Sequence, residues 1–219
     1  MKRKGILMTI LALFLVVGGG VGYYYWYQSA NFIKTEDARV AGDLYRVLPR
    51  MSGKISSVDV KEGDAVLADQ ILGQLDRTTV PSNNLDLSLL RSPINGTVIK
   101  TLVRPGEVIT VGQNAALVVD LKKLYVSANI EETEIDRLRV GEPVDITVDA
   151  FPGKELHGQI SEIGHATNST FSLIPAINTS GNFVKVTQRI PVKISINDSH
   201  EVDLYPGMNT AIKVHVNGN

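Results

Sequence analysis

Cysteine is absent from this chain of 219 residues, and tryptophan occurs only once. The absence of cysteine excludes a disulfide framework, a thiolate zinc site, a catalytic cysteine and a lipid-modified N-terminal cysteine. Histidine is scarce too, and no two histidines lie three or four residues apart, at His157, His165, His200 and His215. This spacing does not fit a metal-binding motif, so we expect no metal site.

Motifs of enzymatic chemistry are missing as well. No GxSxG nucleophile elbow, HExxH zinc motif or phosphate-binding loop occurs in the sequence. Glu131, Glu132 and Glu134 form a carboxylate cluster, but they begin a predicted short helix, where acidic side chains match the helix dipole. We therefore expect no catalytic residue, no cofactor and no enzymatic activity.

A strong excess of charge is lacking. The formal net charge is −1, and Lys2, Arg3 and Lys4 supply three of the positive charges, so the remainder carries −4. No basic patch stands out, and nucleic acid is therefore not an expected partner.

Charge is wholly absent from residues 6–26, a run of 21 positions. As a helix this run would span about 30 Å, the thickness of the hydrocarbon core of a bilayer. The basic trio before it predicts a cytoplasmic N-terminus (1–5), and the aromatic cluster at 23–27 fits the far membrane interface. We expect a single-pass anchor at 6–26 in the cell (inner) membrane, with the bulk of the chain extracytoplasmic.

A cleaved signal peptide is the alternative to an anchor. Its apolar core would be shorter and would be followed by small residues, whereas Gln28-Ser29-Ala30 is a poor cleavage site preceded by bulky aromatics. Gly18 and Gly22 have GxxxG spacing, which fits either packing between helices in a homo-oligomer or a loose glycine-rich helix end.

The sequence contains an internal repeat. Residues 49–76 and 93–120 align at an offset of 43 positions, with four identities: Gly53 with Gly96, Val60 with Val103, Gly63 with Gly106, and Gln70 with Gln113. Two copies are too few for a solenoid, so they predict one small domain with pseudo-two-fold symmetry. The glycines fit turns, and the Val/Ile runs beside them fit short strands.

These half-motifs resemble the two halves of a biotinyl/lipoyl-type sandwich, separated as in the membrane fusion proteins, or periplasmic adaptors, of HlyD/EmrA type. Three further segments resemble the same family: the entry strand Thr35–Val40, the segment Ser180–Val192 (SGNFVKVTQRIPV), and Leu204–Met208 (LYPGM). The resemblance covers nearly all of the chain beyond residue 34.

Beyond the second half-motif, apolar residues alternate with polar ones. The pattern covers Val126–Ile130, Val144–Val148, Val184–Ile196 and Ile212–Val216, whereas Glu131–Leu138 fits one short helix and 165–182 a long loop. Such strands between Gly, Pro and Asn turns indicate a small antiparallel barrel.

The expected fold is therefore mainly β, with an N-terminal transmembrane helix, a lipoyl-like β-sandwich and a small antiparallel β-barrel. The expected boundaries are 27–48 for a linker and entry strand, 49–76 plus 92–120 for the sandwich, 77–91 for a short loop, 121–216 for the barrel and 217–219 for a tail.

The loop at 77–91 departs from the family pattern. In most members this slot holds a long helical coiled-coil hairpin, but 15 residues cannot extend outward and return as helices. The departure puts tunnel building and contact with an outer-membrane duct in doubt. The loop also contains no lysine, which a biotin or lipoate carrier would require.

The resemblance implies an adaptor that docks on an inner-membrane exporter. A major-facilitator drug pump is the first expectation, an ABC exporter the second, and an extracytoplasmic scaffold or sensor without a transporter the alternative class. The resemblance places the segment with Asn182, Phe183, Lys185, Gln188 and Arg189 closest to the membrane, so we expect these residues to face the transporter.

Overall fold

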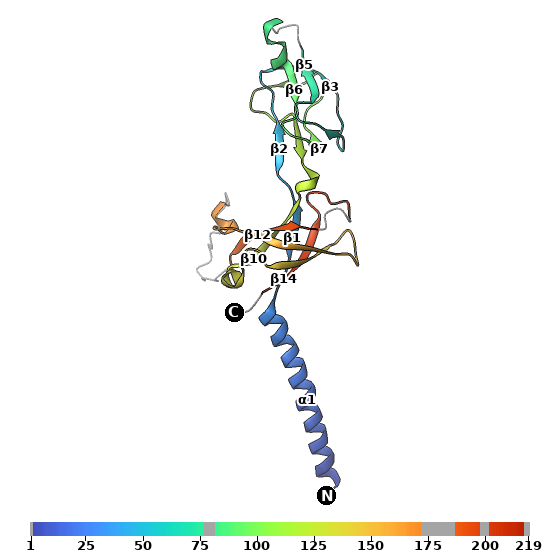
Figure 1. Cartoon of the computed structure of the whole chain (residues 1–219), viewed down its shortest axis with the longest axis vertical. Coiled ribbons are helices and arrows are strands. Elements are labelled where there is room, and N and C mark those ends of the chain that lie inside the picture. Colours follow the sequence, from blue (N-terminus) through green and yellow to red (C-terminus); the bar gives the residue numbers. More distant parts are fainter. Residues whose placement is uncertain (1, 77–81, 172–186, 198–201, 217–219) are drawn as a thin grey trace, which may run out of the picture. The chain divides into compact units, whose positions relative to one another are not determined.

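The computed structural model describes residues 2–76, 82–171, 187–197 and 202–216 (Figure 1). The chain divides into two compact units. One comprises residues 1–39, 126–202 and 208–219, and the other comprises 40–125 with 203–207. Both are built largely of strands, which confirms the mainly β fold. Several predicted segments lie partly or wholly outside the described residues: 77–81 of the short loop, 172–182 of the long loop, 184–186 of the longest alternating stretch and the tail at 217–219.

The first unit contains helix α1 and a closed barrel. The helix runs over Lys2–Asn31. The barrel strands lie in the order β1 (Phe32–Ala41), β10 (Tyr125–Glu131), β13 (Arg189–Ile196), β12 (Glu155–Ile163), β11 (Pro143–Val148) and β14 (Asn209–His215). Period-two alternation explains the core, because the apolar member of each pair, such as Val126, Ile146 or Ile194, is buried.

Residues 27–48, predicted as a linker and entry strand, take a different form. Helix α1 ends at Asn31 and β1 begins at Phe32, so no separate linker lies between them, and β1 belongs to the barrel. The predicted short helix at 131–138 is a 3₁₀ helix, η3 (Glu132–Arg137), because so short a segment closes its turn with i→i+3 bonds. Another 3₁₀ helix, η4, covers Asn168–Phe171.

Within the part of the chain that the structure describes, no helix is both long and apolar enough to cross a membrane.

The second unit is a sandwich of two four-stranded sheets. One sheet has the order β2 (Leu44–Val47), β9 (Ala116–Val119), β7 (Gly96–Thr101) and β4 (Ala65–Val66); the other has β6 (Leu89–Arg91), β5 (Ile71–Leu75), β3 (Gly53–Val58) and β8 (Val108–Ile109). The 3₁₀ helix η1 (Ser82–Ser88) lies between β5 and β6 in the sequence, and η2 (Leu121–Lys123) follows β9.

The two half-motifs interlock across the sandwich. Strand β3 of the first half pairs with β8 of the second, with Gly53 opposite Ile109. Strand β7 of the second half pairs with β4 of the first, with Gly96 opposite Val66. Each half therefore completes a sheet of the other, as the internal repeat predicted, and one core contains apolar side chains of both halves.

Candidate functional site

The predicted transporter-facing segment is described only in part. Asn182, Phe183 and Lys185 lie outside the described residues, whereas Gln188 and Arg189 lie within them. Arg189 is the first residue of β13, and Gln188 directly precedes it. The site is therefore built around the start of this strand.

Arg189 forms an ion pair with Asp37 of β1, from which it is separated by 152 positions in the sequence. Asn129 of β10 donates its side-chain amide to the other carboxylate oxygen of Asp37 at 3.1 Å. Thr35 fixes the neighbouring backbone, because its hydroxyl donates to the carbonyl of Asn129 at 3.2 Å and accepts from the N–H of Asp37 at 3.1 Å. Three strands thus hold one carboxylate in place.

The electrostatics of Asp37 follow from these contacts. Burial by itself would raise the pKa of the Asp37 carboxyl, but the hydrogen bond from Asn129, the contact with Arg189 and the nearby charge of Arg39 lower it more. The pKa of Asp37 is therefore lowered from its ordinary value, and the carboxylate is charged at neutral pH.

Gln188 connects two further segments to this cluster. Its side-chain oxygen accepts a hydrogen bond from the hydroxyl of Ser169 in η4, and its backbone carbonyl accepts from the N–H of Glu132 in η3 at 2.9 Å. The residue before β13 is therefore held at both its side chain and its backbone.

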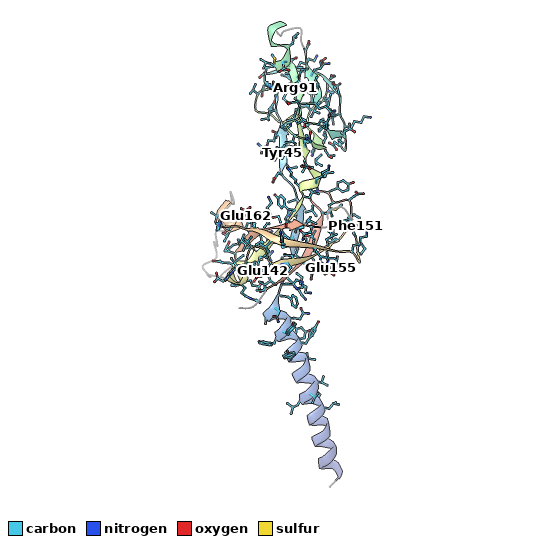
Figure 2. The ribbon with its side chains drawn as sticks, in the orientation of Figure 1. Tyr45, Arg91, Glu142, Phe151, Glu155 and Glu162 are labelled. Carbon is cyan, nitrogen blue, oxygen red and sulfur yellow. The ribbon has the colours of Figure 1, made fainter. Side chains whose placement is uncertain are left out.

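A groove of about 970 Å³ lies beside the cluster on the barrel unit. Acidic side chains outnumber basic ones along it, with Glu36, Asp37, Glu131, Glu134, Asp145 and Glu155 against Lys34, Arg189 and Lys213. Figure 2 labels Glu155, which extends from β12. The surface suits a polar partner of mixed charge better than an apolar ligand.

A second acidic residue of the groove, Asp145, lies between two histidines. Its carboxylate is 2.6 Å from Nε2 of His215 and 3.4 Å from Nδ1 of His157, and the ammonium of Lys213 lies at 3.6 Å. Burial would raise the pKa of Asp145, but His215 and then Lys213 and His157 lower it. Over the described residues, no group of three or more His, Cys, Asp or Glu side chains is arranged to hold a metal ion.

The half-motif residues lie at the turns of the sandwich. Gly63 and Gly106 have φ of 95° and 94°, a conformation that favours glycine. The side-chain oxygens of Gln70 and Gln113 accept from the N–H groups of Leu67 and Thr110, each at 2.8 Å. Gly53 and Gly96 open the equivalent strands β3 and β7. These six residues shape turns and strand starts of the sandwich.

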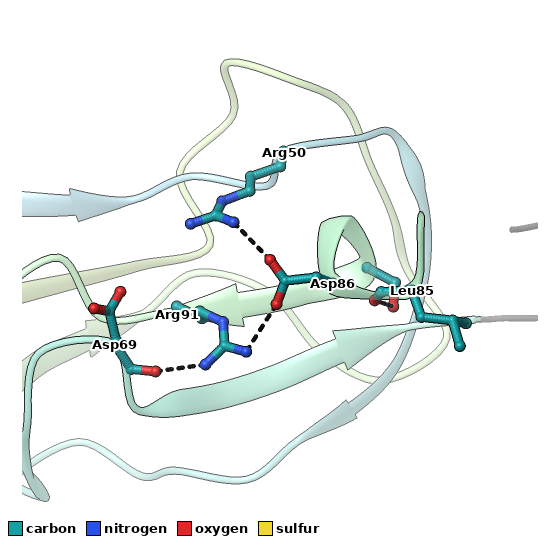
Figure 3. A network of polar contacts seen from close by, with 6 residues as sticks. Arg50, Asp69, Leu85, Asp86 and Arg91 are labelled. Atoms are coloured by element: carbon teal, nitrogen blue, oxygen red, sulfur yellow. Dashed lines mark hydrogen bonds and ion pairs between the residues drawn. The ribbon is translucent and has the colours of Figure 1, made fainter. Parts of the chain in front are cut away.

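One carboxylate, that of Asp86, joins a network of polar contacts in the sandwich unit (Figure 3). Asp86 of η1 accepts from Arg91 at 2.8 Å and from Arg50 at 2.9 Å. Arg91 also donates to the backbone carbonyl of Asp69 at 2.8 Å. The hydrogen bond from Arg91, together with the charges of both arginines, lowers the pKa of Asp86 although desolvation opposes it.

Sequence reasoning missed two residues of the main cluster, Asp37 and Asn129. Asp37 lies inside the predicted entry segment Thr35–Val40, but no pattern in the sequence indicates its pairing with Arg189. Only the closed barrel places β1 and β13 on either side of β10. No linear spacing signals that relation.

Comparison with known proteins matches both units to described domains. Residues 44–121 match the barrel-sandwich hybrid domain of RND membrane fusion proteins, and residues 123–217 match the AAEA-like beta-barrel domain.

Similar proteins have names that refer to efflux. The putative efflux system component YhbJ of Bacillus subtilis (strain 168) is 39% identical over 187 residues, which cover 85% of this chain and 81% of that protein. The multidrug export protein EmrA of Escherichia coli (strain K12) is 36% identical over 155 residues, which cover 68% of this chain but only 40% of EmrA.

A solved structure shares the fold. The membrane fusion protein Spr0693 from Streptococcus pneumoniae R6 superposes with a TM-score of 0.62 at 15% identity, covering 85% of this chain and 99% of that one.

Proposed function

The chain belongs to the membrane fusion protein family of efflux adaptors, and we propose that it docks on an exporter of the same membrane, a major-facilitator drug exporter in the first instance. The observation that carries this proposal is the match to a multidrug export protein across 155 residues. That match covers 68% of this chain. An ABC exporter is the second candidate.

The cluster around Arg189 is the proposed docking surface. Asp37 pairs with the guanidinium of Arg189, and Asn129 in turn holds Asp37. The carbonyl of the adjacent Gln188 accepts from the N–H of Glu132, so the position of Arg189 is fixed before a partner binds. Preorganised polar groups give specificity and orientation at a small entropic cost. A tethered partner needs only a weak surface, because the shared membrane raises the effective concentration.

Helix α1 is the proposed anchor. Support comes from the uncharged stretch 6–26 and from the apolar side chains Leu13, Phe14 and Leu15, which are 65–78% exposed. An apolar helix surface of this size needs a membrane or a partner to cover it. With the N-terminus in the cytoplasm, protease outside spheroplasts should digest the barrel and the sandwich; a mature N-terminus at Asn31 would contradict the anchor.

We propose that this adaptor builds no tunnel, because the short segment 77–91 takes the place of the family's long helical hairpin. The segment between β5 and β6 contains η1, seven residues long, closed onto the sandwich by Asp86. The chain spans 81% of the Bacillus relative but 40% of EmrA, which fits a short adaptor lacking a long insertion.

Site-specific photo-crosslinking tests this orientation. A crosslinker at Arg189 or Ser169 in the full chain should capture an integral membrane exporter, whereas one at Asp86 should capture no outer-membrane duct. Glu162, exposed on β12, serves as a control position on the same barrel. Capture of a duct at Asp86 together with no capture at Arg189 would reverse the proposed orientation.

A further inference from the structure

The C-terminal end of α1 lacks the usual means of satisfying its own backbone. The last four carbonyls of a helix have no partner within the helix, and they usually bond a glycine-based cap or a basic side chain in the last turn. Helix α1 has no basic residue in its last turn, and Phe32 rather than glycine follows Asn31.

The barrel supplies the missing donors. The guanidinium of Arg137 donates to the carbonyls of Ser29 and Ala30, both at 2.8 Å. The backbone N–H of Val216 donates to the carbonyl of Asn31 at 2.9 Å. A positive charge at a helix C-terminus also complements the helix dipole. The cap of this helix therefore comes from residues more than 100 positions away in the sequence.

Side chains reinforce the junction. The ring of Phe32, the first residue of β1, lies 6.4 Å from that of Tyr27 in the helix and 5.0 Å from that of His215 in β14. The ammonium of Lys213 lies 4.2 Å from the centre of the same ring. Because helix and strand follow each other without a linker, these contacts leave little freedom for a hinge.

The 3₁₀ helix η3 links this junction to the start of β13. Arg137 at its C-terminal end binds the carbonyls of α1, and the N–H of Glu132 at its N-terminal end donates to the carbonyl of Gln188 at 2.9 Å. Glu134, between them, lies 3.6 Å from the guanidinium of Arg137. One short element thus contacts both helix α1 and the residue beside Arg189.

We propose that η3 fixes the position of the docking surface around Arg189 relative to α1, with Arg137 as the positioning residue. We call η3 in this role the bracket. This inference rests on the proposed function for the identity of the docking partner and for the anchoring of α1 in the membrane. The bracket itself is a property of the single chain. It orients the surface around Gln188 and Arg189 toward a transporter embedded in the same membrane as the helix.

Distance measurements on the full chain in lipid nanodiscs test the bracket. The chain contains no cysteine, so spin labels can be attached at Tyr25→Cys and Thr187→Cys without removing native thiols. The account predicts one narrow distance distribution, which Arg137→Ala broadens or splits. Arg137→Lys should give an intermediate result. Both bonds come from the single nitrogen Nη2, and an ammonium on the flexible lysine stem would hold the two carbonyls less rigidly than the planar guanidinium does.

Arg139→Ala is the matched control. Arg139 has the same charge two positions further on, but its guanidinium donates to the carbonyls of Asp136 and Leu138, within its own segment. Its loss should leave the narrow distribution in place. Hydrogen exchange of β11 and β12 checks that each variant keeps a folded barrel; if Arg137→Ala does not fold, Arg137→Lys decides the test.

The outcomes separate the bracket from the docking proposal. A distribution unchanged by Arg137→Ala in a folded barrel overturns the bracket, whatever the crosslinks show. A distribution that broadens while Arg189 captures no exporter in the native chain supports the bracket and rejects the docking partner. Broadening together with loss of the Arg189 crosslink in Arg137→Ala supports both.

Discussion

Asp69 and Gly112 occupy equivalent positions in the two copies of the sandwich repeat, and both have positive φ, of 63° and 92°. Among the described residues, Asp69 is the non-glycine residue with such a backbone. Each lies directly before the glutamine that closes its turn. The two halves therefore share a left-handed backbone conformation at this position. Only the second half has glycine there, the residue that adopts it without strain.

Replacing Asp69 with glycine should stabilise the sandwich. Glycine removes the left-handed strain but adds freedom to the unfolded chain, so the expected net gain in the free energy of unfolding is about 0.5 kcal/mol. The bond from Arg91 survives, because it reaches the backbone carbonyl of Asp69. Urea unfolding measures the change, and Gly112→Asp, the reverse exchange in the other copy, should lower the same free energy.

Gly63→Val and Gly106→Val should each damage both halves of the sandwich. The two glycines have φ of 95° and 94°, and no atom lies within 4 Å of the point that a Cβ would occupy, so the cost is backbone strain of about 1–3 kcal/mol each. Because β3 pairs with β8 and β7 with β4, hydrogen exchange should accelerate in both copies. Protection retained in the undamaged copy would mean that the halves fold independently.

Gly53 and Gly96 are equivalent in the repeat but should differ in their tolerance of alanine. A Cβ at Gly96 would lie 2.3 Å from the carbonyl oxygen of Val119, whereas one at Gly53 would meet Leu75 at 3.5 Å. Gly96→Ala should therefore cost on the order of 2 kcal/mol or more through backbone displacement, and Gly53→Ala should cost little. Equal melting temperatures for the two variants would refute this asymmetry.

Asp37 should make the barrel sensitive to acid. Its pKa is lowered from the ordinary 3.8 in the folded chain, so its contribution is present above the unfolded pKa and is lost as the pH falls through the folded pKa. Asp37→Asn should lower stability by about 1 kcal/mol or less at pH 7, since the ion pair is partly exposed. The difference from the native chain should vanish in strong acid.

The matched control for this pH series is Glu36→Gln, which neutralises the neighbouring carboxylate. Unfolding curves at several pH values compare the two variants with the native chain. A difference between Asp37→Asn and the native chain that stays constant down to about pH 2, below the ordinary range of carboxyl pKa values, would show that the carboxylate charge is not what stabilises the cluster.

The repeat revealed the interlocked sandwich because its symmetry is local, with glycines and glutamines at turns that demand them. Its outer strands were harder to predict, because β2 and β6 match in burial at Val47 and Leu90 rather than in identity. Alternation predicted the barrel strands β10, β11, β13 and β14, whereas β1 was expected only as an entry strand and β12 was not predicted. The pairing of Asp37 with Arg189, and the cap that Arg137 gives to α1, depend on barrel closure between distant segments, and the sequence carries no periodic signal for either.

The identity of the integral membrane protein that co-purifies with the intact chain tests the central claim most directly. Gentle detergent extraction followed by mass spectrometry should recover a major-facilitator exporter. Arg189→Glu, which reverses the charge facing Asp37, should reduce its recovery, while Lys154→Glu, on the exposed turn before β12, should not. If neither the native chain nor the Lys154→Glu variant recovers an integral membrane protein, the adaptor function proposed for this surface is contradicted.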